Sequence, residues 1–139
     1  MTQTERIDDF YRKLYEFEFI RTHGFERYRF GSDEFFACAS TLRSKSGRRI
    51  TVSFNIHDEE PDEVELVLQF LNKSSLEQIR TVCEKVAIEE GTDINLYEEP
   101  DCISATAYFD IEDVDGPVSM MTNILDKVSK VVLFMINND

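Results

Sequence analysis

This sequence contains few of the residues, and none of the short motifs, that carry most catalytic and metal chemistry. Among 139 residues it has 2 histidines and 3 cysteines, and the cysteines form no CxxC pair and lie near no histidine. This spacing argues against a zinc site and a disulfide framework, so we expect Cys38, Cys83 and Cys102 to be buried apolar residues in a reducing compartment. Glycine-rich phosphate loops, G-x-S-x-G and H-E-x-x-H are also absent, so the sequence predicts no catalytic residue, cofactor or metal site.

The chain also lacks a long apolar run and a targeting segment. Its longest apolar run, VVLFMI at 131–136, is far shorter than the ~20 residues that span a bilayer, so we predict no membrane span. The N-terminus has neither the basic start nor the apolar stretch of a secretory signal, which leads us to expect a cytoplasmic protein. With 5 Gly, 3 Pro and 42% hydrophobic residues, we expect residues 1–139 to form a single globular domain.

Acidic residues outnumber basic ones and give the chain a net charge of −13. The imbalance lies in residues 51–139, which hold 5 Lys or Arg against 20 Asp or Glu, whereas residues 1–50 hold 10 against 8. A surface of this charge repels a phosphate backbone, so we do not expect nucleic acid as a general partner.

Basic residues are interleaved with aromatic ones between residues 21 and 49. They are Arg21, Arg27, Arg29, Arg43, Lys45, Arg48 and Arg49. Two interpretations of this segment stay open. The basic side chains neutralise the protein's own acids, which we favour, or they form a patch for a peptide, a lipid headgroup or nucleic acid.

The spacing of apolar residues predicts three helices, which lie within 4–24, 74–91 and 115–137. Thr2 with Glu5 and Ser74 with Glu77 have the spacing of capping boxes. We expect Gly24 and Gly91 to end the first two helices in the left-handed conformation, and Pro117 to lie in the first turn of the third.

Alternating apolar residues predict strands over 34–42, 50–56 and 64–71, which form a meander, and a second hairpin within 93–113. The predicted fold class is therefore α+β, with an antiparallel sheet of about five strands and helices packed on one face, in the order α-β-β-β-α-β-β-α. In this sheet Val67 and Tyr108 fall on the polar side of the alternation, so we expect both to point away from the helices.

The stretch HDEEPDE, residues 57–63, lies between two well-patterned strands. Pro61 and Asp62 are ordinary turn residues, and clustered acids at a loop tip are commonly solvated, so we interpret the stretch as a turn. A calcium site would need spaced ligands, a glycine for the sharp bend and a closing glutamate, and this spacing is absent.

A second class of function depends on whether His57, Asp58 and Arg48 converge in one cleft. Convergence would favour a small-molecule or metal-ion binding domain, or an enzyme that uses this region. A solvent-exposed spread of the three side chains would argue against this class.

Three segments carry a resemblance to a known group of proteins: ITVSFNI and VELVLQFL in the meander, and ISATAYFDIEDVDGPVSMMTNILDKVSKVVLFMI at the end. With the order of elements, they resemble the type III secretion chaperones and YbjN-like proteins, which share a fold. The last unit is most similar to the YbjN group. The stretch EKVAIEEGTDINLY departs from the L-N-x-x-N segment common in that group, so both subgroups stay open.

The resemblance implies a protein without catalytic activity that binds proteins or peptides, as a chaperone-like or regulatory partner. It also implies that the chain can form a homodimer, because the secretion chaperones form dimers. A sheet with one face under helices can leave the other face or an edge strand free for a partner. Our candidate contacts are Val67 and Tyr108 on that face, with Arg48 and Arg49 beside the first hairpin.

Overall fold

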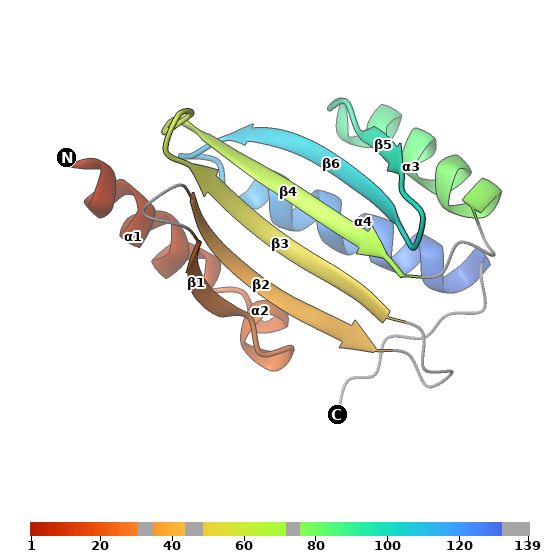
Figure 1. The fold of residues 1–139 in the computed structure, drawn as a ribbon, viewed down its shortest axis with the longest axis horizontal. Helices are drawn as coiled ribbons and strands as arrows, with labels where there is room; N and C mark the ends of the chain where they lie inside the picture. Colours follow the sequence, from red (N-terminus) through yellow and green to blue (C-terminus); the bar gives the residue numbers. More distant parts are fainter. Residues whose placement is uncertain (31–34, 44–48, 72–75, 132–139) are drawn as a thin grey trace.

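A computed structural model of the chain describes residues 1–30, 35–43, 49–71 and 76–131 (Figure 1). The elements are α1 (Gln3–Leu14), α2 (Glu18–Thr22), β1 (Glu26–Phe30), β2 (Phe35–Arg43), β3 (Arg49–His57), β4 (Glu63–Phe70), α3 (Leu76–Glu90), β5 (Asn95–Glu98), β6 (Ile103–Asp110) and α4 (Asp115–Val131). The strands form one antiparallel sheet in the order β1-β2-β3-β4-β6-β5. This architecture is the α+β class that the sequence predicts.

Helices α1 and α4 lie on the same side of the sheet, and α3 packs against α4 (Figure 1). Alternation along the strands explains this arrangement. In β3 and β4 every second residue is apolar and buried, namely Ile50, Val52, Phe54, Ile56, Val64, Leu66, Leu68 and Phe70. Because successive side chains point to opposite faces, these residues form one continuous apolar surface that the helices cover.

The first helical segment is broken, where the sequence suggested a single helix up to Gly24. Helix α1 begins with the predicted capping box, in which Thr2 and Glu5 exchange hydrogen bonds of 3.2 and 3.3 Å. The chain then takes an extended conformation at Phe17 before α2 begins. The Arg21 guanidinium donates to the Tyr15 carbonyl at 2.6 Å and so satisfies a group at the end of α1. Gly24 follows α2 with a φ of 65°, as expected.

The sheet has six strands where we expected about five, and the observed order is α-α-β-β-β-β-α-β-β-α. The additional strand is β1, which the sequence shows only as an aromatic and basic stretch, ERYRF. Its positions on the helix side are Arg27 and Arg29, while Tyr28 lies on the opposite face, so the side of the strand that faces the core carries no apolar residue to mark it. These guanidiniums stack instead on the rings of Tyr11 and Phe36, at 4.8 and 5.0 Å from the ring centres.

The ends of the later helices follow the predicted signals where the structure describes them. Gly91 has a φ of 66°, and the Thr92 amide donates to the Ala87 carbonyl at 3.1 Å, which closes α3. Pro117 lies in the first turn of α4. Ser74, the other predicted cap, lies outside the described residues. Cys38, Cys83 and Cys102 are buried free thiols, which confirms their predicted placement.

No helix in the described part of the chain is both long and apolar enough to cross a membrane.

Phe54 occupies the centre of the core, and its removal tests the fold. Its side chain is fully buried and packs against Phe10 of α1 and against Phe25, with ring centres 6.4 and 5.9 Å apart. We expect Phe54→Ala to lower the free energy of unfolding by about 3–5 kcal/mol, measured by urea titration. Ile88→Ala is the control, because Ile88 is 82% exposed and its truncation should change stability by less than about 0.5 kcal/mol. Equal effects of the two changes would contradict this view of the core.

Candidate functional site

The face of the sheet opposite α1 and α4, here called the open face, is covered by no helix among the described residues (Figure 1). Its side chains lie in rows that run across the strands. One row contains Tyr28, Ala37, Asn55, Glu65 and Tyr108, which are directly opposite one another from β1 to β6. The open face therefore presents a polar centre between two tyrosines.

The neighbouring rows complete the open face. The next row contains Glu26, Ala39, Ser53, Val67, Thr106 and Asn95. Beyond it lie Thr41, Thr51, Gln69, Ser104 and Tyr97. Most of these side chains are small or uncharged, and none of the three tyrosines on this face is buried.

Glu65 is the centre of a hydrogen-bond network on the open face. Its carboxylate accepts hydrogen bonds of 3.1 Å each from Asn55 Nδ2, His57 Nε2 and the Tyr108 hydroxyl. Because an ionised carboxylate only accepts, Nε2 of His57 carries the hydrogen in this contact. Ser53 extends the network by donating to the side-chain oxygen of Asn55. Residues of three strands are thus joined through one carboxylate.

The network sets the charge state of Glu65. Partial burial acts to raise its pKa, but the hydrogen bonds from Asn55, His57 and Tyr108 outweigh this effect and hold the pKa below its ordinary value. Burial and the adjacent Glu65 carboxylate raise the pKa of Tyr108, so its hydroxyl stays protonated and can donate. The centre of the open face is therefore a fixed negative charge with its donors already in place.

The predicted contact residues have different positions in the sheet. Val67 and Tyr108 lie on the open face in adjacent rows, away from the helices as predicted. Arg49 is also on this face, opposite Arg43 and at the far end of the strands from His57. Arg48 lies outside the described residues. Whether these residues contact a partner stays a prediction.

Sequence reasoning missed Asn55 and Glu65, the two residues at the centre of the network. The available signal was the polar half of the strand alternation, in which Ser53, Asn55 and His57 of β3 fall on the same side. Pairing of β3 with β4 brings Glu65 opposite Asn55, and the register of that pairing cannot be read from either strand alone.

Arg48 lies outside the described residues, so whether His57, Asp58 and Arg48 converge in one cleft stays a prediction. His57 points to Glu65, while Asp58 is exposed in the turn between β3 and β4. In the part of the chain that the structure describes, no group of three or more His, Cys, Asp or Glu side chains is arranged to hold a metal ion.

The acidic stretch 57–63 is a turn, as predicted, and two contacts attach it to the rest of the protein. Asp62 forms an ion pair with Arg6 of α1 at 2.5 Å, and its carbonyl accepts from the Ile111 amide at 2.9 Å. The turn is therefore held against both the first helix and the segment after β6.

Strand alternation divides the basic segment between the two faces of the sheet. Arg27 lies on the helix side, where it pairs with Asp8 at 2.8 Å. Arg43 and Arg49 are exposed on the open face. The described basic residues thus form no single patch, and Arg27 shows the charge neutralisation that we favoured.

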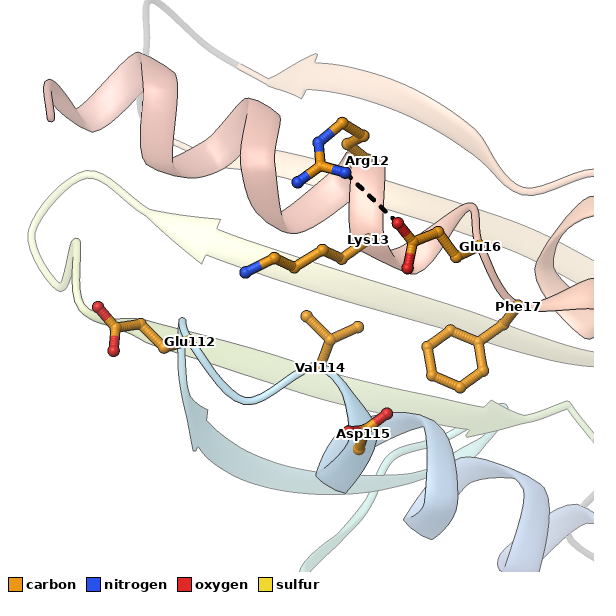
Figure 2. A pocket seen from close by; sticks show the side chains of 7 residues that line it. All are labelled: Arg12, Lys13, Glu16, Phe17, Glu112, Val114 and Asp115. Atoms are coloured by element: carbon orange, nitrogen blue, oxygen red, sulfur yellow. Dashed lines mark hydrogen bonds and ion pairs between the residues drawn. The ribbon is translucent and has the colours of Figure 1, made fainter.

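A separate pocket of about 490 Å³ lies between the end of α1 and the start of α4 (Figure 2). It is lined by Arg12, Lys13, Glu16, Phe17, Glu112, Val114 and Asp115. The cations are already neutralised within α1, since Arg12 pairs with Asp9 and Glu16 at 2.7 and 3.4 Å and Lys13 pairs with Asp9 at 3.0 Å. The pocket is large enough for a small molecule but offers no unpaired cation among these residues to anchor an anion.

No protein-family model matches the chain, and neither the search of curated proteins nor the search of solved structures returned a match.

The depressed pKa of Glu65 predicts how the stability of the protein depends on pH. A carboxyl whose pKa is lower in the folded state stabilises the fold above its unfolded pKa, and this contribution is lost as the pH falls through the folded pKa. We expect Glu65→Gln to lower the free energy of unfolding by about 1–2 kcal/mol near neutral pH. The difference from the wild type should shrink as the pH falls below the ordinary carboxyl value of 4.5.

Urea titrations at a series of pH values measure this difference. Tyr108→Phe is the control, since it removes one donor and keeps the carboxylate, and its effect should be smaller than that of Glu65→Gln. A difference between Glu65→Gln and the wild type that stays constant from neutral to acidic pH would contradict the assigned role of Glu65.

Proposed function

We propose that this protein is a non-catalytic binding module of the cytoplasm, chaperone-like or regulatory, that holds a segment of a partner protein on its open face. The resemblance to the type III secretion chaperones and YbjN-like proteins supports this proposal through the order of elements from β2 to α4. It leaves both subgroups open.

The observation that carries the proposal is the set of three exposed tyrosines on one uncovered sheet face. Tyr28, Tyr97 and Tyr108 are 44%, 52% and 44% exposed, and they come from three different strands. Tyrosine combines a large apolar ring with a hydrogen-bonding tip and loses little conformational entropy on binding, so it is enriched in protein interfaces. With Val67 and several small polar side chains between them, these rings suit a partner with mixed apolar and polar side chains.

The face suits a partner better than either edge of the sheet does. Strand β5, at one edge, has only four residues, and β1, at the other, has five and carries two arginines. Short and charged edge strands are the devices by which proteins discourage the addition of another strand. The strands at the centre of the open face, β3, β4 and β6, are longer, with 9, 8 and 8 residues.

The buried thiols support a non-catalytic role. Burial raises the pKa of Cys83 to about 12 and also raises the pKa of Cys38. Both residues therefore stay protonated at neutral pH, and a thiol that is protonated and enclosed is a poor nucleophile.

The pocket between α1 and α4 supports the second candidate, a small-molecule binding domain. Its volume falls within the usual range for small ligands, and Phe17 and Val114 give it an apolar wall (Figure 2). We rank it second because its basic residues already have acidic partners within α1.

Affinity capture with matched variants tests the proposal. The full chain is immobilised as wild type, as the double variant Tyr97→Ala/Tyr108→Ala, and as Ile88→Ala, which truncates an exposed apolar side chain on α3. Proteins captured from the native cytoplasm are identified by mass spectrometry, and affinities for them are then measured with purified proteins. We expect the double variant to bind at least tenfold more weakly than the wild type, since exposed aromatic anchors contribute about 2 kcal/mol or more each.

The control variant Ile88→Ala should bind like the wild type. Circular dichroism and urea titration establish that all three proteins are folded, and light scattering gives their oligomeric state. A partner that binds all three equally well would place recognition outside the open face and refute the proposal.

A further inference from the structure

Charge on the open face is distributed unevenly along the strands. At the end beside the acidic turn lie Glu63 and Asp110, which are directly opposite each other in the pairing of β4 with β6. At the other end lie Arg43 and Arg49, also directly opposite each other. The negative charge of Glu65 lies next to the acidic end. A segment bound along the strands therefore contacts negative charge at one end of the face and positive charge at the other.

The pair formed by Glu63 and Asp110 is a local conflict within the sheet. Like charges directly opposite on neighbouring strands destabilise the pairing. Both side chains are exposed, and neither forms an ion pair with a cation among the described residues. Nearby Asp62 differs, because Arg6 of α1 neutralises it at 2.5 Å. Among the described residues, a cation thus neutralises the carboxylate beside α1, and none pairs with the two that face the open surface.

We infer that the bound segment is cationic and extended, and that a lysine or arginine side chain of the partner lies between Glu63 and Asp110. This inference rests on the proposed function and adds the chemistry of the partner. A cation between two opposed carboxylates relieves their repulsion, and an arginine fork can bond to both at once. Tyr108, in the next row toward the centre of the face, then lies beside the aliphatic part of that side chain and can pack against it.

The net charge of the protein favours a cationic segment over the other candidates for binding to the open face. A phosphate backbone and an acidic peptide are both repelled by a chain of net charge −13, and so is a second copy of the chain. A metal ion would need additional ligands, and no cluster of three or more His, Cys, Asp or Glu with that capacity occurs among the described residues. A cationic partner is attracted over a long range and steered to the acidic end of the face.

Selection from a random peptide library tests the inference without a known partner. A phage-displayed library of dodecapeptides is selected on the wild-type protein and depleted on Tyr97→Ala/Tyr108→Ala, a variant that leaves the charge unchanged. We expect the retained peptides to be enriched in lysine and arginine over the unselected library. One retained peptide is then synthesised with a fluorescent label, and its Kd is measured by anisotropy at two salt concentrations.

Two double variants separate the local effect from that of overall charge. Glu63→Gln/Asp110→Asn removes the proposed cation partners, and Glu77→Gln/Glu84→Gln removes the same charge from exposed positions on α3. We expect the first to raise Kd at least tenfold and to reduce its salt dependence. The second should change Kd less than threefold, in line with the weak influence of charges distant from an interface.

The outcomes distinguish this inference from the proposed function. Retained peptides without enrichment in lysine and arginine, or with equal Kd for the two double variants, would overturn the inference and leave the proposed function standing. If depletion on the tyrosine variant removes every peptide that binds the wild type, or if no peptide is selected at all, both would be overturned. A dimer in light scattering that dissociates when Tyr97 and Tyr108 are truncated would show that a second copy occupies the open face, and would overturn the inference.

Discussion

The structure depends on the burial of one side of a six-stranded sheet. In β3, β4 and β6 alternate residues are apolar, and together they form a surface that α1 and α4 cover, with Phe54 near its centre. Burial of apolar area is the main driving force of folding, and in this protein it is concentrated on one face. The same alternation places polar side chains on the other face, where Tyr28, Tyr97 and Tyr108 remain exposed.

The parts of the fold that sequence could predict are those in which a local pattern and the core agree. The alternation of ITVSFNI and VELVLQFL identifies β3 and β4, and the capping box at Thr2 identifies the start of α1. The positions of Val67 and Tyr108 away from the helices followed from that alternation. Local propensity and burial favour the same structure in these segments, so neither overrides the other.

The parts that sequence could not predict depend on contacts between distant segments. Strand β1 is stabilised by pairing with β2 and by the stacking of Arg27 on Tyr11, and neither contact can be read from ERYRF alone. The break between α1 and α2 occurs within LYEFEFI, where Leu14, Phe17 and Ile20 have the spacing of a continuous helix. The central carboxylate of the open face was missed for the same reason. The role of Glu65 depends on hydrogen bonds from Asn55 on β3 and Tyr108 on β6, which lie in other segments of the chain.

The Glu65 network also bears on how the chain avoids misfolding. A sheet whose strands shift by one residue exchanges its two faces, and in β4 such a shift would move Glu65 into the apolar layer beneath α1 and α4. An ionised carboxylate there would be desolvated and without its three donors, a penalty of several kcal/mol. The polar face therefore acts against slipped pairings of β3, β4 and β6 during folding, and it limits the alternative strand associations from which aggregates begin.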